Sequence, residues 1–302
     1  MPDGAGPVRR VRHATLTVAA IALALGGGAT WLVLRGVPGQ AQPTDEFANV
    51  LMHVHGLGVD PADGVLYAAS HTGLFRLPED PSGKAERVAD RWQDTMAFTV
   101  VGPNRFLASG HPDLREDEPD MLGLIESRDA GETWEALSRQ GVSDFHVLQP
   151  AGGLLYGYDS TAGRLLVTVD QQTWQARSTM VMTALAANPA DTGTLLAVAA
   201  DGGLRRSEDG GRSFTPLPGT PVLATLAWPD PGVVYGTDPD GTVLTSPDGG
   251  TTWQPRGTLD GPAAALTAED LATVHVATDT GVYTSTDGGR TFEVRYPITL
   301  GR

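Results

Sequence analysis

The chain of 302 residues contains no cysteine. This absence excludes disulfide bonds, metal sites built from thiolates and lipid attachment through an N-terminal cysteine. Aromatic residues are also scarce, at 6%, whereas the chain has 38 glycines and 22 prolines. Such a composition is typical of many short strands joined by turns, and it predicts an all-β fold rather than a helical one.

Positive charge is scarce after residue 35, where 17 basic residues stand against 35 acidic ones. A surface of this sign repels the phosphates of nucleic acids, so no nucleic-acid partner is expected. The same surface attracts cations. The sequence also lacks a phosphate-cradling loop, a dinucleotide fingerprint and a nucleophile elbow. No nucleotide cofactor is therefore expected.

One long uncharged run, ATLTVAAIALALGGGATWLVL, occupies residues 14–34. As a helix that rises about 1.5 Å per residue, it is long enough to cross the roughly 30 Å hydrocarbon core of a bilayer. Arg9, Arg10 and Arg12 precede it. Because positive residues flank the cytoplasmic side of membrane helices, this arrangement predicts a cytoplasmic N-terminus and an extracytoplasmic remainder.

The N-terminal segment is therefore expected to be a targeting segment and not part of the folded domain. The predicted parts are a cytoplasmic tail at 1–13, a transmembrane signal anchor at 14–35 and a flexible linker at 36–48. The protein would then be held at the cell membrane by one helix. The alternative is secretion after cleavage near Ala41.

An internal repeat organises the rest of the chain. Its five copies are SRDAGETW (127–134), VTVDQQTW (167–174), SEDGGRSF (207–214), SPDGGTTW (246–253) and STDGGRTF (285–292). Short strand-like segments separated by turns surround each octet, and four short strands in about 40 residues are typical of a propeller blade. The sequence predicts a six-bladed β-propeller over residues 49–298, with blades at 53–92, 95–142, 143–181, 182–221, 222–261 and 262–297.

The octet pattern S-x-D-x-G-x-[TS]-[WF] resembles the Asp box, or BNR repeat, of sialidase-like β-propellers. In that family the box is a structural turn on the face away from the active site. The resemblance therefore assigns a structural role to Asp129, Asp170, Asp209, Asp248 and Asp287. The octets are expected to connect the third and fourth strands of their blades.

A second resemblance rests on the fragments HVHGLG, DTMAF, SGHP and SDFH. They are similar to segments of secreted or membrane-anchored bacterial propellers that are described as glycosylhydrolase-like. The positions that this resemblance carries over best are His55, Met96, His111 and His146.

The histidines are expected to gather at the end of the propeller opposite the octets. In each blade this end carries the start of the innermost strand and the connection between the second and third strands. Five histidines fall at such positions in blades one to three: His53, His55, His71, His111 and His146. Met96 belongs to the same end.

Imidazole and thioether donors without thiolate suit copper, and the imidazoles alone suit zinc. The sequence therefore predicts a binding protein with a metal site, copper first and zinc second. Asp94, Asp144, Glu116, Glu118 and Asp120 are candidates for further oxygen ligands or orienting partners. Two alternatives remain for the histidines: a polar, hydrogen-bonded channel mouth, or a general base that works near neutral pH.

The enzymatic alternative is a sialidase-like glycoside hydrolase. The weak candidates for its carboxylates are Asp94, Asp120 and Asp144, since glycosidases need two carboxyl groups about 5–10 Å apart. The Arg-Ile-Pro motif of sialidases is absent, and no innermost strand offers an arginine. A third alternative is a scaffold that binds a protein partner through the acidic insertion at 111–122.

Overall fold

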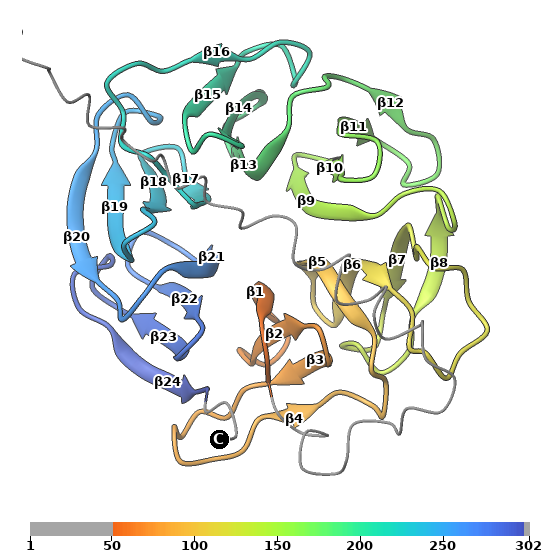
Figure 1. The fold of residues 1–302 in the computed structure, drawn as a ribbon. Helices are drawn as coiled ribbons and strands as arrows, with labels where there is room; N and C mark the ends of the chain where they lie inside the picture. Colours follow the sequence, from red (N-terminus) through yellow and green to blue (C-terminus); the bar gives the residue numbers. More distant parts are fainter. Residues whose placement is uncertain (1–50, 299–302) are drawn as a thin grey trace, which may run out of the picture. The chain divides into compact units, whose positions relative to one another are not determined.

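The computed structural model describes residues 51–298, and within them the chain forms six four-stranded antiparallel sheets arranged as the blades of a propeller (Figure 1). In every sheet the four strands follow one another in the order of the sequence. The prediction of an all-β, six-bladed propeller is therefore confirmed. The predicted tail, signal anchor, linker and cleavage position lie outside the described residues. Residues 51–298 contain no helix with the length and hydropathy that a bilayer crossing requires.

The first three blades carry the predicted site residues. Blade one contains β1 (Val54–Val59), β2 (Leu66–Ser70), β3 (Gly73–Arg76) and β4 (Glu86–Arg87). Blade two contains β5 (Asp94–Gly102), β6 (Arg105–His111), β7 (Leu124–Ser127) and β8 (Glu135–Ser138). Blade three contains β9 (Phe145–Ala151), β10 (Leu154–Asp159), β11 (Arg164–Thr168) and β12 (Gln175–Ala176).

The remaining three blades complete the ring. Blade four contains β13 (Met182–Asn188), β14 (Asp191–Ala199), β15 (Leu204–Ser207) and β16 (Thr215–Pro216). Blade five contains β17 (Thr225–Asp230), β18 (Val233–Thr237), β19 (Thr242–Ser246) and β20 (Gln254–Thr258). Blade six contains β21 (Ala263–Ala268), β22 (Val274–Thr278), β23 (Gly281–Ser285) and β24 (Glu293–Pro297).

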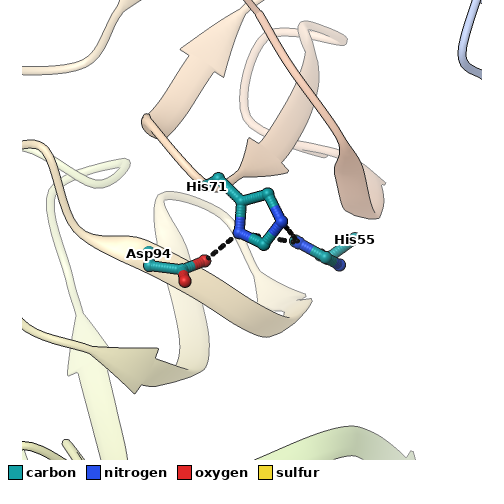
Figure 2. A group of neighbouring side chains, drawn as sticks. All are labelled: His55, His71 and Asp94. Atoms are coloured by element: carbon teal, nitrogen blue, oxygen red, sulfur yellow. Dashed lines mark hydrogen bonds and ion pairs between the residues drawn. The ribbon is translucent and has the colours of Figure 1, made fainter. Parts of the chain in front are cut away.

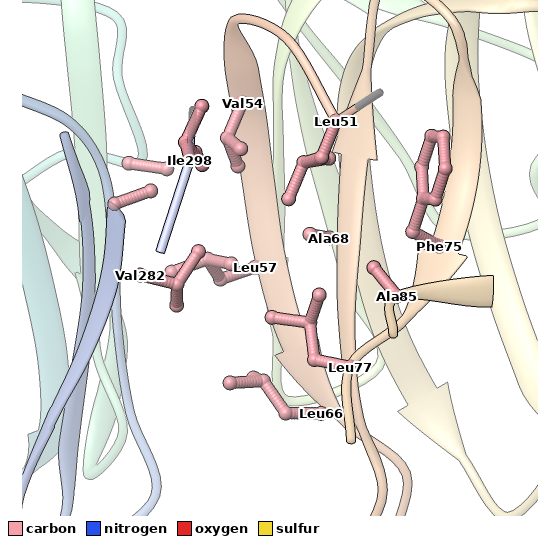
Figure 3. Packing of buried hydrophobic residues seen from close by; sticks show 12 residues of the cluster. Leu51, Val54, Leu57, Leu66, Ala68, Phe75, Leu77, Ala85, Val282 and Ile298 are labelled. Atoms are coloured by element: carbon pink, nitrogen blue, oxygen red, sulfur yellow. The ribbon is translucent and has the colours of Figure 1, made fainter. Parts of the chain in front are cut away.

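The innermost strand of each blade contacts that of the next, and β21 of blade six contacts β1 of blade one, which closes the ring. Apolar side chains seal this junction: Val54 and Leu57 of β1 pack in one buried cluster with Val282 of β23 and Ile298 (Figure 3). Each such side chain contributes about 1.5–3 kcal/mol when it is fully buried. Ring closure therefore rests on packing between blades, because each blade takes all four of its strands from one continuous segment.

The repeated octets lie between the third and fourth strands of blades two to six. In blade five, Ser246 Oγ donates to Asp248 Oδ1 at 2.8 Å and accepts from the backbone N–H of Gly250 at 2.8 Å. Asp248 in turn accepts from the backbone and the hydroxyl of Thr252 at 2.8 and 2.7 Å. Gly249 and Gly250 have φ angles of 68° and 92°, which residues with a Cβ rarely adopt.

The other octets use the same carboxylate in the same way, with Thr168 in place of serine before Asp170. All five octet aspartates therefore act within turns, at the end of the propeller away from the histidines. This position follows from the antiparallel strand order, because successive connections alternate between the two ends.

Candidate metal centre

The strand order brings the predicted histidines to one end of the propeller. In each blade the first strand begins where the second strand ends, so Val54 of β1 pairs with Ser70 of β2, and Asp94 of β5 pairs with His111 of β6. We call this end of the propeller the mouth. The residues that gather there are His53, His55, His71, Asp94, His111, Asp144 and His146. They come from three consecutive blades.

His71 lies between Asp94 and His55 (Figure 2). Its Nδ1 is 2.8 Å from Asp94 Oδ1, and the two side chains are 27% and 15% exposed. Because an ionised carboxylate only accepts hydrogen bonds, Nδ1 of His71 carries the proton. In the neutral ring the other nitrogen, Nε2, carries the lone pair that an electron-pair acceptor could bind.

His55 lies against the edge of the His71 ring that carries both nitrogens. Its Nε2 lies 3.3 Å from Nε2 of His71 and also 3.3 Å from Nδ1, and the two rings meet edge to face at 76°. A directed hydrogen bond would favour one nitrogen over the other, and this geometry favours neither. The two imidazoles are therefore close together without satisfying each other.

The protonation state of His55 is set by its surroundings. Burial lowers the pKa of His55 to about 4, with the neighbouring His71 as the next contribution and Asp94 acting in the opposite direction. At neutral pH the ring is therefore uncharged, which is the state that binds a metal ion. His55, His71 and Asp94 offer ligand atoms that all lie within 4.8 Å of one another.

A second group of imidazoles surrounds Asp144, just before β9. Nε2 of His146 donates to Asp144 Oδ2 at 2.8 Å, and Nε2 of His111 lies 3.9 Å from the same oxygen. Ser160 Oγ donates to this oxygen at 3.0 Å, whereas Nδ1 of His111 donates to the backbone oxygen of Asp120 at 2.7 Å. The other carboxylate oxygen, Asp144 Oδ1, is buried and has no hydrogen-bond partner among residues 51–298.

Asp144 remains ionised in this position. Burial by itself would raise its pKa, but the hydrogen bond and charge of His146, followed by the charge of His111, outweigh burial and hold the pKa below its usual value. The mouth therefore combines an anionic buried carboxylate with imidazoles on both sides.

An acid–imidazole pair recurs at three successive junctions between blades. His53 Nδ1 lies 3.9 Å from Asp279 Oδ1 at the junction of blades six and one. His71 pairs with Asp94 between blades one and two, and His111 with Asp144 between blades two and three. In each pair one residue ends or follows the second strand of its blade, and the other lies at the start of the innermost strand of the next blade. Sequence reasoning missed Asp279 and Ser160, although aligning the ends of the second strands would have found both.

The remaining predicted residues have more ordinary surroundings. His53 is exposed, with a positive φ of 48°, and its ring centroid lies 5.3 Å from that of His71. Met96 is only 8% exposed. Asp120 is exposed and contributes its backbone oxygen to His111. His275, predicted as a structural residue, is buried in blade six, where it bonds Thr284 and Glu269.

The arginines near the mouth are bound to acids. Arg91 Nη2 lies 2.9 Å from Glu116 and 2.9 Å from Glu118, and Arg115 Nη2 lies 2.6 Å from Asp113. These ion pairs use the guanidinium groups that a sialidase would need for a substrate carboxylate. The pairs of Arg91, together with Arg115 Nη1 at 3.0 Å from Asp90 Oδ2, also anchor the insertion at 111–122 against the connection between blades one and two.

Comparison with known proteins supports the fold. No family model and no curated protein sequence matches the chain. Many solved structures do. A gluconolactonase from Xanthomonas campestris has a TM-score of 0.62 at 13% identity, covering 82% of this chain and 94% of that one. YCF48 bound to D1 peptide has a TM-score of 0.53 at 18% identity, covering 81% and 82%.

A GH74 xyloglucanase from Xanthomonas campestris has a TM-score of 0.52 at 22% identity. The match covers 81% of this chain but only 38% of the xyloglucanase, so this chain spans well under half of that enzyme's length. At such identities the similarity establishes the β-propeller fold, which enzymes and binding proteins share.

Proposed function

We propose that this protein is a metal-binding propeller of the Asp-box class, which binds a divalent transition-metal ion, Cu²⁺ or Zn²⁺, through Nε2 of His55 and Nε2 of His71. Asp94 orients His71 through the hydrogen bond to Nδ1. In metal sites a ligand histidine commonly donates its second N–H to a carboxylate, which fixes the ring and makes the ligand nitrogen more basic.

One observation carries this proposal: the two Nε2 atoms are 3.3 Å apart. Two nitrogens bound at about 2.0–2.1 Å to a tetrahedral zinc ion lie about 3.3–3.4 Å from each other. The lowered pKa of His55 adds to this, because it keeps the ring neutral at pH 7 without competition from a proton. The negative charge of the domain favours the approach of a cation.

The proposed setting of the site is extracytoplasmic. The predicted signal anchor at 14–35 would hold the propeller outside the membrane, and the absence of cysteine means that the site does not depend on a reducing compartment. A site built from imidazole and carboxylate is stable against oxidation under such conditions.

Calorimetric titration of the metal-free full chain with Zn²⁺ and with Cu²⁺ tests the proposal. We expect one ion per chain, and loss of binding in the His55→Asn/His71→Asn double variant. The matched control is His275→Asn, which removes a buried histidine from blade six and should leave binding unchanged. Stoichiometric binding by the double variant, or no binding by the unmodified chain, would refute the proposal.

A second candidate function is the recognition of a protein partner through the insertion at 111–122. Ion pairs of Glu116 with Arg91 and of Arg115 with Asp90 attach it to the connection between blades one and two, while Leu114 remains 52% exposed. A photo-crosslinker at Leu114 should then capture one discrete partner in the native cells. The same probe at Val294, which is 44% exposed in blade six, should not. Equal capture from both positions would argue against a specific surface.

The sialidase-like hydrolase has less support. Asp94 and Asp144 are bound to imidazoles, and Arg91 and Arg115 to acids. A panel of fluorogenic glycosides tests this alternative. Hydrolysis that is abolished by Asp94→Asn or Asp144→Asn would favour it over metal binding.

A further inference from the structure

The innermost strands of five blades have an irregular pairing near the mouth: in blades four and six it leaves out Thr183 and Ala264, and in blades one to three it leaves out a predicted ligand residue. The pairing of β1 with β2 steps from Val54 to Gly56 and leaves out His55. The pairing of β5 with β6 steps from Thr95 to Ala97 and leaves out Met96. The pairing of β9 with β10 steps from Phe145 to Val147 and leaves out His146. Each omitted residue is the extra residue of a β-bulge.

These three bulges occupy one structural position. In each blade the residue before the bulge pairs at the end of the second strand: with the last residue, Ser70 or Asp159, in blades one and three, and with the last but one, Gly110, in blade two. A bulge interrupts the alternation of side chains and redirects one of them, and bulges are frequent at barrel rims and beside active sites. His55, Met96 and His146 are therefore presented alike by three neighbouring blades.

The bulges also adjoin one another. β1 contacts β5, and β5 contacts β9, so Met96 comes from the strand between the two that carry the histidines. Met96 is buried, yet it belongs to none of the six apolar clusters found among residues 51–298.

We propose that these three side chains form a binding site for monovalent copper, with His55 and His146 as nitrogen ligands and Met96 as a thioether ligand. Soft sulfur donors select Cu⁺, whereas Zn²⁺ and Cu²⁺ are served by nitrogen and oxygen. His146 keeps Nδ1 for the ion because its Nε2 bonds Asp144, just as His71 uses one nitrogen for Asp94.

This inference rests on the proposed function, because His55 belongs to both sets of ligands. His55 and His71 provide the two nitrogen ligands for a divalent ion. His55, Met96 and His146 provide the softer ligands for Cu⁺. The buried, unpartnered oxygen Asp144 Oδ1 is consistent with a positive charge bound nearby.

Competition with a chromophoric Cu⁺ chelator under reducing conditions tests the inference on the full chain. The variant is Met96→Leu, which keeps the size and apolar character of the side chain. The matched control is Met182→Leu, since Met182 also begins an innermost strand but keeps its pairing with Ala199 and is buried in an apolar cluster. Thermal unfolding of both variants reports on the fold.

We expect Met96→Leu to lower Cu⁺ affinity more than about tenfold and to leave Zn²⁺ affinity unchanged, because only the soft ion uses the thioether. Met182→Leu should change neither. Unchanged Cu⁺ affinity in Met96→Leu, or an equal loss for both ions, would overturn the inference. If the chain binds Zn²⁺ but no Cu⁺, the Cu⁺ site is refuted and the proposed function stands. If the chain binds neither ion, the proposed function is refuted as well.

Discussion

Nε2 of His55 lies 3.3 Å from Nε2 of His71, and the opposite nitrogen of His71 is bonded to Asp94. Burial keeps His55 uncharged at neutral pH, and the carboxylate fixes the proton of His71 on Nδ1. Ring nitrogens of two histidines thereby lie close together at the propeller mouth, which is the basis of the metal site that we propose.

Replacing Asp94 by asparagine should weaken metal binding without removing a ligand nitrogen. The amide no longer stabilises the orientation and basicity of His71, and loss of such a partner typically costs about 10–100-fold in metal affinity. Competition titration with a zinc indicator measures the change. An affinity within twofold of the unmodified chain would show that Asp94 has no orienting role.

The stability of the metal-free protein should depend on pH through His55. Its pKa falls from 6.5 in the unfolded chain to about 4 in the folded protein. Above 6.5 the ring is neutral in both states, so the contribution is fully present. As the pH falls from 6.5 toward 4, His55 takes up a proton in the unfolded chain but stays neutral in the folded protein. The free energy of unfolding therefore decreases.

Urea unfolding of the metal-free protein at about pH 7 and about pH 5 measures this loss. The His55→Asn variant has no group to titrate at this position, so its free energy of unfolding should fall less over the same interval. Equal losses in both proteins would contradict the assignment of the effect to His55.

Asp248→Ala should destabilise blade five without affecting the mouth. The substitution leaves the N–H groups of Thr251 and Thr252 and the hydroxyl of Ser246 without their acceptor. A cost of about 1–3 kcal/mol is expected for removing a charged acceptor. Asp240→Ala is the control, because Asp240 is an exposed residue in the turn of the same blade. Loss of zinc binding in Asp248→Ala at unchanged stability would contradict a purely structural turn.

Gly110→Ala should disturb both stability and the site. Gly110 has a φ of 146°, and a Cβ there would overlap the carbonyl oxygen of Asp94 and approach the nitrogen of Met96 to 2.9 Å. The start of β5 must then shift, at a cost of roughly 1–3 kcal/mol, and metal affinity should fall with it. In Gly163→Ala the added Cβ has no atom within 4 Å. This variant should lose only about 1–2 kcal/mol of stability to left-handed backbone strain, and its metal site should be unaffected. Calorimetry and zinc titration distinguish the two variants.

Much of the fold could be predicted because each blade is a local unit. The octet around Asp248 forms its hydrogen bonds within eight residues, so its pattern is visible in the sequence wherever it recurs. The end of the propeller at which His55 and His71 lie was also predictable, since it follows from counting strands.

The pairing of side chains at the mouth could not be predicted in this way. His71 and Asp94 belong to different blades, and their contact depends on how closely two sheets pack. The sequence leaves Asp94 open as an oxygen ligand, an orienting partner or a weak catalytic candidate, and its hydrogen bond to His71 is what leads us to propose the orienting role. The bulges at His55, Met96 and His146 were missed because a skipped residue leaves no signature in composition or spacing.

The sequence by itself determined the number of blades, the turns that close them and the end that receives the histidines, because these depend on interactions within about 40 residues. Only the tertiary structure decided which imidazole meets which carboxylate and which side chains the bulges redirect. Those choices depend on the register of β1, β5 and β9 and on the contact between neighbouring blades, which the closure of the ring imposes on residues far apart in the chain.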